Sequence, residues 1–235
     1  MALTANRTGN RILDLLPGDE SSRLLSSSQA VSMPHGQEVY RHNGPMPHVY
    51  FPTTGVFGIV VLMEEGKLLE GTTVGNEGVV GLPAFLGVDF HPFSLVCHVP
   101  GEAVQVSAAT FVQALKPGDT LDRLLRRYTL YRLRCANQVG ACNTLHSVEE
   151  RMCRWLLMAH DRAGKDEFLL THEFLSELLG VRRQTVSIIA GTLQRAGFIS
   201  YRRGVLRVLD REGLESACCE CYEAMKQLYD RIMGC

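Results

Sequence analysis

Residues 171–197 read THEFLSELLGVRRQTVSIIAGTLQRAG, and this stretch decides how the second half of the chain folds. Thr171 is a good helix N-cap, and apolar residues at helical spacing follow it. Gly180 then supplies a sharp turn, because glycine adopts positive φ angles without steric cost. A second helix follows, and its buried side consists of Val186, Ile189, Ala190 and Leu193. Two short helices joined by a tight turn predict a helix-turn-helix.

The open side of the second helix carries polar side chains near its start, where base edges would be met. We expect DNA contacts from Arg182, Arg183, Gln184, Thr185 and Ser187. The alternative is a plain antiparallel helix pair, which would need neither the central glycine nor two arginines and a glutamine on one outer face. The pattern therefore favours a DNA-reading helix.

Charge is distributed unevenly along the chain. The 235 residues have a formal net charge of −1, which argues against a protein that coats nucleic acid everywhere. Between Thr171 and Arg211, however, seven arginines stand against three acidic residues. A basic region within a slightly acidic protein suits a local phosphate-contacting footprint.

Composition and length indicate a folded chain of two domains. Hydrophobic residues make up 46% of the chain and charged residues 21%, as in globular proteins. The N-terminal residues have no apolar core of signal-peptide length, and no run reaches transmembrane length. We therefore expect a cytoplasmic protein without membrane contact, whose eight cysteines are reduced thiols.

Short β-rich runs alternate with turn residues between about Gln37 and Ser107. The runs cover residues 38–41, 49–52, 55–63, 67–74, 94–99 and 103–107. Many short strands at even spacing predict a small barrel or sandwich. A short helix over 110–116 follows and ends at Pro117-Gly118.

A long helix is predicted next, with Asp119 or Thr120 as its cap. Two adjoining rows of residues recur along it at intervals of seven. The rows are Leu121, Tyr128, Cys135 and Cys142, and Leu124, Tyr131, Gln138 and Leu145. A seam of this length on a helix between two domains favours a dimer interface through these eight residues. The alternative is a single helix that lies against its own domain.

The last part of the chain completes a winged helix. Ser147-Val148-Glu149-Glu150 is a capping box, which predicts a new helix directly after the long one. Two β-rich runs, 198–201 and 205–209, flank Arg202-Arg203-Gly204 and predict a β-hairpin. We expect Arg202 and Arg203 at its tip to contact DNA. The tail from Glu212 onward has apolar residues at helical spacing.

A strand-rich sensor, a long heptad helix and a C-terminal winged helix, in this order, resemble the cyclic-AMP receptor protein / fumarate-nitrate regulator (Crp/Fnr) family of bacterial transcription factors. The resemblance covers most of the chain and includes the pattern between Val49 and Gly81. It is strongest in GVRRQTVSIIAGTLQRAGFI (180–199) and VEERMCRWLLMAHDR (148–162). It implies a sensor of the cyclic-nucleotide-binding type and a dimer that reads a two-fold symmetric DNA site.

The resemblance also bears on which bases are read. In the family's best-known member an Arg, the Glu after it and a second Arg four positions on meet bases. Here Arg183 matches the first Arg, whereas Gln184 and Ile188 stand at the other two positions. The same docking is implied, but not the same half-site, since Arg suits guanine and Gln suits adenine.

The effector implied by the family does not carry over. Its cyclic-nucleotide binders hold the phosphate with Gly-Glu and a later Arg-Ser pair. Here Glu77-Gly78 has the reversed order, and His91-Pro92 stands where Arg-Ser would be. Neither can form a bidentate arginine–phosphate clamp. We expect an effector other than cyclic AMP, in a pocket that includes Glu77, Gly78, His91, Ala136 and Asn137.

Two cofactors of the family can be judged from the sequence. Iron–sulfur sensing needs cysteines near the N-terminus, and the first cysteine here is Cys97, which argues against a cluster. Haem stays open because histidines gather in the sensor region at positions 35, 42, 48, 91 and 98.

The cysteine side chains are the remaining candidates for a functional role. Cys218, Cys219 and Cys221 lie within four residues, and Cys235 is terminal. Structural zinc usually takes two separated pairs of ligands, and three thiols on one helix would point around its axis. We therefore expect buried apolar cysteines and no metal. No phosphate-binding glycine loop or catalytic motif is present, so we do not expect an enzyme.

Taken together, these patterns predict an α+β fold. It has an N-terminal cyclic-nucleotide-binding-like β-roll (1–118), a long dimerisation helix (119–146) and a C-terminal winged helix-turn-helix with a helical tail (147–235). We interpret the protein as a homodimeric regulator that binds double-stranded DNA and an unknown small-molecule effector, and the resemblance adds RNA polymerase as a partner. The alternative is a thiol-based redox or metal-binding module whose winged helix serves protein contacts.

Overall fold

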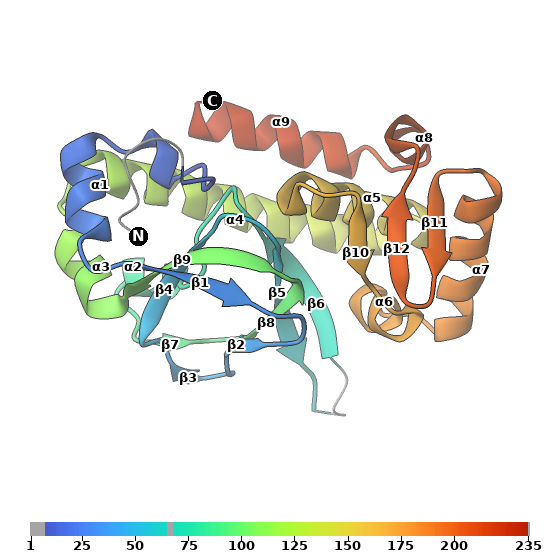
Figure 1. Ribbon diagram of the computed structural model, residues 1–235, viewed down its shortest axis with the longest axis horizontal. Helices are drawn as coiled ribbons and strands as arrows, with labels where there is room; N and C mark the ends of the chain where they lie inside the picture. The colour runs from blue at the N-terminus through green and yellow to red at the C-terminus, as the bar shows by residue number, and fades with distance from the viewer. Residues whose placement is uncertain (1–7, 65–67, 235) are drawn as a thin grey trace.

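The computed structural model describes residues 8–64 and 68–234. One antiparallel sheet places β9 (Gly101–Ser107) between β1 (Gln29–Met33) and β4 (His48–Pro52). A second sheet has the order β2 (Glu38–Tyr40), β8 (Ser94–Val99), β5 (Val56–Leu62) and β6 (Leu68–Val74). A short pair, β3 (Gly44–Pro45) and β7 (Phe90–His91), adjoins them (Figure 1). These strands form the expected β-roll.

Apolar side chains from both sheets meet in one core. Phe51 of β4, Phe57 of β5 and Leu95 of β8 are buried there. The six predicted runs correspond to observed strands, although position 67 of the run 67–74 lies outside the described residues. Strand β1 is not predicted because its sequence, QAVSM, lacks the alternation of apolar and polar residues that marks a half-buried strand.

Several short helical segments come before the long helix in the chain, and one of them contacts its first residues. They are a 3-10 turn (Leu13–Leu15), α1 (Gly18–Leu25), α2 (Leu82–Phe85) and α3 (Ala108–Ala114). The carboxylate of Glu20 in α1 accepts hydrogen bonds from the backbone N–H groups of Thr120 (3.0 Å) and Leu121 (2.9 Å). These are the first residues of α4 (Thr120–Leu145), whose N-cap, Asp119, makes no side-chain cap bond. The cap is therefore supplied from a distant part of the chain.

Helix α4 lies against its own chain, with α9 (Cys221–Met233) running along it (Figure 1). Tyr131 of α4 and Tyr229 of α9 pack edge to face, with ring centroids 5.1 Å apart. Six of the eight residues predicted for the dimer seam are buried in the core that α4 shares with the β-roll and α9. They are Leu121, Leu124, Tyr128, Tyr131, Cys135 and Cys142. The prediction that they face a partner is wrong, because heptad spacing indicates an apolar face but not what covers it.

The winged-helix half begins at the predicted capping box. Ser147 accepts a hydrogen bond from the backbone of Glu150 (3.3 Å), and the Glu150 carboxylate accepts one from the backbone of Ser147 (2.8 Å). The elements that follow are α5 (Val148–Ala163), β10 (Glu167–Leu169), α6 (His172–Leu179), α7 (Arg183–Arg195), β11 (Ile199–Arg202), β12 (Val205–Val208) and α8 (Arg211–Ser216). The three strands form one sheet in the order β10-β12-β11.

The two helices of the C-terminal tail pack in different places: α8 packs on α5, whereas α9 packs mainly on α4. Residues 217–220 separate α8 from α9, so the tail is two helices and not one. Cys219, Met225 and Tyr229 are buried in the same core as the β-roll and α4. The prediction groups α9 with the winged helix at 147–235, whereas most of the buried residues of α9 pack in the core of the β-roll and α4.

Candidate functional site

The helix-turn-helix forms as its sequence indicates. The Thr171 hydroxyl accepts a hydrogen bond from the backbone of Phe174 (3.1 Å) and caps α6. Gly180 ends α6 with φ of +64°, a left-handed conformation that glycine adopts without strain. Helix α7 then buries its inner face, which consists of Val186, Ile189, Ala190 and Leu193.

The outer face of α7 is open and polar at its start. Arg182, Arg183, Gln184 and Ser187 are exposed, and Thr185 is half-buried. Arg183 forms a long, exposed ion pair with Glu173 of α6 (Nε to Oε2, 3.6 Å). A pair of this kind is weak in water and leaves the guanidinium free to exchange its partner for another acceptor.

The wing carries its arginines at the turn. Arg202 pairs with Val205 at the end of the hairpin, which places Arg203 and Gly204 in the two-residue loop. Both have positive φ angles, +53° for Arg203 and +79° for Gly204, as a tight hairpin turn of this length requires. Arg202 and Arg203 are both exposed. The structure thus presents two guanidinium groups at the tip of a narrow hairpin.

A cavity lies between the second sheet and α4. Its volume is about 500 Å³, and its lining is mainly apolar, from β5, β6, the α2 segment and α4. Glu70 and Arg132 are the charged groups among the described lining residues. Of the five residues predicted for an effector pocket, His91 and Ala136 line this cavity, whereas Glu77, Gly78 and Asn137 do not. Helix α4 instead presents Arg132, Ala136, Val139, Gly140 and Asn143.

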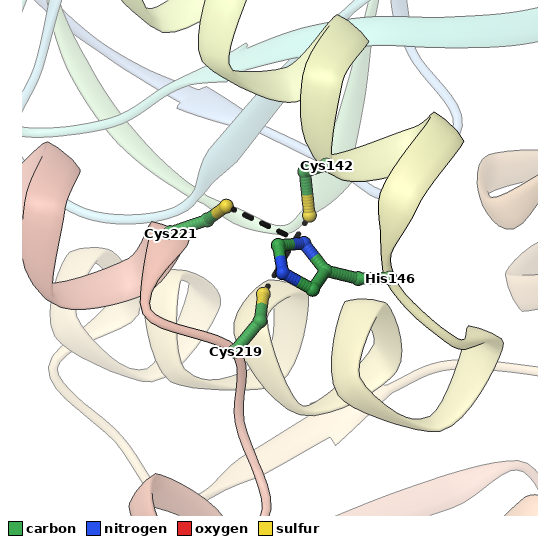
Figure 2. A group of neighbouring side chains, drawn as sticks. All are labelled: Cys142, His146, Cys219 and Cys221. Atoms are coloured by element: carbon green, nitrogen blue, oxygen red, sulfur yellow. Dashed lines mark hydrogen bonds between the residues drawn. The ribbon is translucent and has the colours of Figure 1, made fainter.

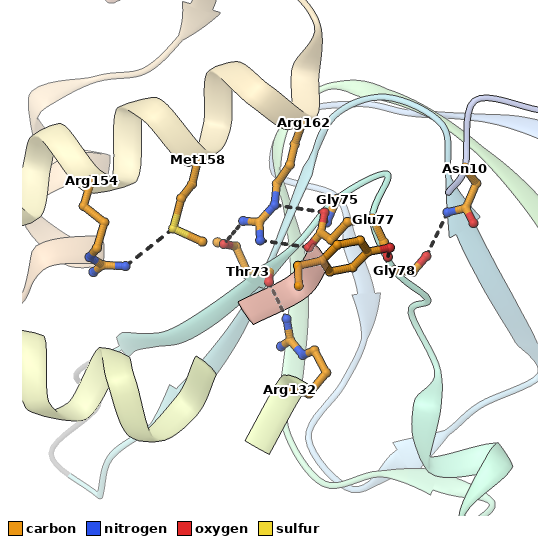
Figure 3. Close-up of polar contacts among 10 residues, drawn as sticks. Asn10, Thr73, Gly75, Glu77, Gly78, Arg132, Arg154, Met158 and Arg162 are labelled. Carbon is orange, nitrogen blue, oxygen red and sulfur yellow. Dashed lines mark hydrogen bonds and ion pairs between the residues drawn. The ribbon is translucent and has the colours of Figure 1, made fainter. Parts of the chain in front are cut away.

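Glu77 forms a buried ion pair instead of lining the cavity (Figure 3). Its carboxylate accepts two hydrogen bonds from Arg162 of α5, from Nε at 3.0 Å and from Nη2 at 2.8 Å. Both side chains are buried, with 8% and 7% of their surface exposed. Arg162 also donates to the Thr73 hydroxyl. This bidentate pair joins the β-roll to the winged-helix half.

The glycines beside Glu77 make room for protein side chains and not for a ligand. A Cβ at Gly75 would lie 2.4 Å from Cγ of Arg162. A Cβ at Gly78 would lie 1.8 Å from the hydroxyl of Tyr128 on α4. The Gly-x-Glu-Gly segment is therefore shaped by the helices that pack on it, which corrects its assignment to the effector pocket.

Other contacts also hold the winged-helix half against the β-roll. The indole N–H of Trp155 on α5 donates to the Glu70 carboxylate (3.0 Å). Phe174 of α6 packs edge to face on His98 of β8, with ring centroids 4.8 Å apart. Glu70 and His98 are themselves buried 2.9 Å apart. The Trp155 hydrogen bond and the Phe174 ring contact therefore involve the two members of one buried pair, Glu70 and His98.

Three histidines of the β-roll, His35, His42 and His91, make contacts with other residues of the same chain. The Nδ1 atoms of His35 and His42 lie 2.7 Å and 2.8 Å from backbone carbonyls, those of His98 and Pro92. His91 stacks on Tyr40 with ring centroids 4.8 Å apart. Burial lowers the pKa of His91, against a smaller opposing effect of its hydrogen bond to the Phe93 carbonyl. His91 is therefore neutral at neutral pH.

Cys97 and Cys153 are buried thiols away from the tail. Burial raises the pKa of Cys97 and of Cys153 to about 12. Both are therefore protonated at neutral pH and act as small apolar groups. Cys235 lies outside the described residues.

Four other residues form a cluster that the sequence does not predict. Cys142 and His146 at the end of α4 meet Cys219 and Cys221 of the tail, and their donor atoms all lie within 4.8 Å of one another. The sequence argument against a metal assumed that the tail cysteines share one helix. In fact Cys219 lies between α8 and α9, and Cys221 is the first residue of α9. The prediction that these cysteines lie on one helix is therefore wrong.

Two family models match the chain. The cyclic nucleotide-binding domain matches residues 30–117, and the Crp-like helix-turn-helix domain matches residues 150–217. Together with the fold, they define the class of the protein as a DNA-binding transcription regulator with a domain of the cyclic nucleotide-binding type. The protein belongs to the Crp/Fnr family.

Solved structures of this family share the fold. FixK2 from Bradyrhizobium japonicum is 20% identical over 82% of this chain and 98% of its own, with a TM-score of 0.67. TTHB099, a CRP-family transcriptional regulator from Thermus thermophilus, is 16% identical over 87% and 97%, with a TM-score of 0.64. The c-di-GMP-responsive regulator CLP from Xanthomonas campestris is 17% identical over 82% and 99%, with a TM-score of 0.62.

No curated protein matches the chain. Within residues 8–64 and 68–234, none of the helices combines the length and apolar character that a membrane span requires.

Proposed function

We propose that this regulator acts as a homodimer that reads a two-fold symmetric DNA site through α7 and responds to a mainly apolar effector. The observation that carries the proposal is the open face at the start of α7, where Arg183 and Gln184 are exposed on a rigid helix. Arg202 and Arg203 on the wing are suited to phosphates, because a turn tip fixes base edges less well than a helix.

The dimer would form through the face of α4 that its own chain leaves open. Leu130 and Leu133 are 52% and 60% exposed. Together with Asn137, Gly140 and Thr144 they repeat at alternating intervals of three and four, which is the spacing of a coiled-coil seam. Gly140 would let two backbones approach closely, and Asn137 would favour one register. This seam replaces the six buried residues of the heptad rows, and Leu145 of those rows, which is 77% exposed, lies beside it.

The effector would bind in the cavity of about 500 Å³ beside the same helix. Its size is within the range of small-molecule sites, and its apolar lining suits a ligand with few polar groups. Arg132 would meet an acidic group on that ligand. Gly140 lines the cavity and also belongs to the proposed seam, so an occupant would act directly on the spacing of the two subunits. Recruitment of RNA polymerase is a further part of this proposal.

A titration of labelled DNA followed by fluorescence anisotropy tests the reading helix. Arg183→Ala should cost about 1–3 kcal/mol on the preferred duplex and much less on a scrambled one, because a base-specific contact is lost. Arg41→Ala removes an exposed charge on the β-roll, outside the helix-turn-helix, and serves as the control. Equal losses on both duplexes would make Arg183 a phosphate contact. Absence of salt-dependent DNA binding would favour a winged helix that contacts protein.

A further inference from the structure

Two separated pairs of metal-binding side chains meet where α4 ends (Figure 2). Cys142 and His146 are four residues apart and so lie on the same side of the helix end. Cys219 and Cys221 come from the segment that leads into α9, with Glu220 between them. We call Cys142, His146, Cys219 and Cys221 the hinge cluster, because His146 and Ser147 join α4 to α5.

The spacing of the donor atoms fits a single tetrahedral ion. The Sγ atoms of Cys142 and Cys219 are 3.6 Å apart, and Sγ of Cys221 lies 3.6 Å from Nδ1 of His146. Zinc bonds of about 2.3 Å to sulfur and about 2.0–2.1 Å to nitrogen place two sulfurs about 3.8 Å apart and a sulfur and a nitrogen about 3.5 Å apart. A disulfide would need about 2.05 Å between the sulfurs.

The histidine is oriented for metal binding. Its Nδ1 atom faces the thiols, and its Nε2 atom lies 3.1 Å from the carboxylate of Glu220. A carboxylate behind a ligating histidine fixes the ring and strengthens it as a donor. On the other side, the Gln138 amide donates a hydrogen bond to Sγ of Cys221 (3.1 Å), as a donor to a thiolate would.

Burial and charge fit the same interpretation. Cys142 and Cys221 are fully buried, and Cys219 is 5% exposed. Zinc with three thiolates carries one negative charge, which needs a cation nearby in a buried place. Arg151 and Arg154 are buried and lie close enough to Cys142 to act on it electrostatically. The Nε atom of each has no hydrogen-bond partner among the described residues.

We propose that the hinge cluster binds one zinc ion as a structural site. Four protein ligands and a buried location leave no open position for catalysis. The ion would tie the junction of α4 and α5 to the start of α9, and so hold the DNA-binding half at a set angle to the long helix. Donors this close exclude an iron–sulfur cluster, since iron and sulfide atoms would have to fit between them.

Metal analysis of the full-length protein tests the proposal. Wild-type protein purified without chelator should contain about one zinc per chain by mass spectrometry. Cys142→Ser and Cys221→Ser should each lower the zinc content at least several-fold. Cys218→Ser is the matched control, because this half-buried neighbour is not a member of the cluster. It should keep the full zinc content.

A second measurement uses the wild-type chain and so does not depend on whether a variant folds. Protein stripped of metal and titrated with Co²⁺ should reach saturation at one ion per chain, with the strong visible absorption of tetrahedral cobalt bound to thiolates. Zinc should then displace the cobalt and remove that absorption. Metal-free wild-type protein that gives only weak octahedral cobalt spectra would overturn the proposal. So would zinc that persists in Cys142→Ser and Cys221→Ser.

Discussion

Replacement of Glu77 by Gln tests the buried contact between the sensor and the DNA-binding half. Gln keeps the shape of the side chain but removes the charge that balances Arg162. The pair is 8% and 7% exposed, and its two hydrogen bonds measure 2.8 Å and 3.0 Å. Arg162 would be left buried without a counter-charge, and breaking a buried pair in this way costs about 3–5 kcal/mol. We expect Glu77→Gln to lower the free energy of unfolding by that amount.

Urea unfolding followed by tryptophan fluorescence measures the effect. Trp155 is the only tryptophan of the chain, and it donates a hydrogen bond to Glu70 across the same boundary. The control is Glu167→Gln, because the ion pair of Glu167 with Arg207 is long (3.7 Å) and exposed, and should contribute less than about 1 kcal/mol. If both variants lost the same stability, the buried pair would not hold the two halves together.

Other parts of the molecule can be tested in the same way. Arg202→Ala with Arg203→Ala should weaken binding to all DNA alike and lower the slope of log affinity against log salt by about 2, measured by anisotropy. Leu133→Asp should give a monomer at micromolar concentration by sedimentation, whereas Val112→Asp, at an exposed site elsewhere, should leave the wild-type dimer. Calorimetry should detect no tight cyclic AMP binding, and a micromolar dissociation constant would contradict this. His91 should make the protein less stable as the pH falls below about 6.5, because its lowered pKa means that the unfolded chain binds the proton first, and His91→Gln should remove that part of the pH dependence in urea titrations.

Local signals in the sequence predict the local structure of the site well. The Thr171 cap, the Gly180 turn and the Ser147 capping box each depend on residues within a few positions, and the structure has all three. The exposed position of Arg183 follows from the same helical periodicity. Such features are set by hydrogen bonds within one turn, so neighbouring residues suffice to predict them.

Long-range contacts are what the sequence does not predict. Glu77 and Arg162 are 85 positions apart, and Cys142 and Cys219 are 77 positions apart. The apolar rows of α4 correctly indicate a buried face, but α9 and the β-roll cover it rather than a second subunit. A single sequence gives the periodicity of a face and not the identity of its partner.

Selection of bound sequences from random double-stranded DNA tests whether the protein reads DNA as a two-fold symmetric dimer. A dimer that places two α7 helices in successive major grooves should enrich an inverted repeat, with half-site centres separated by about 10 base pairs or a multiple of that spacing. Arg183→Ala should relax the preference at one position in each half-site and leave the spacing unchanged. Enrichment of no sequence, or of a single half-site without symmetry, would contradict the account.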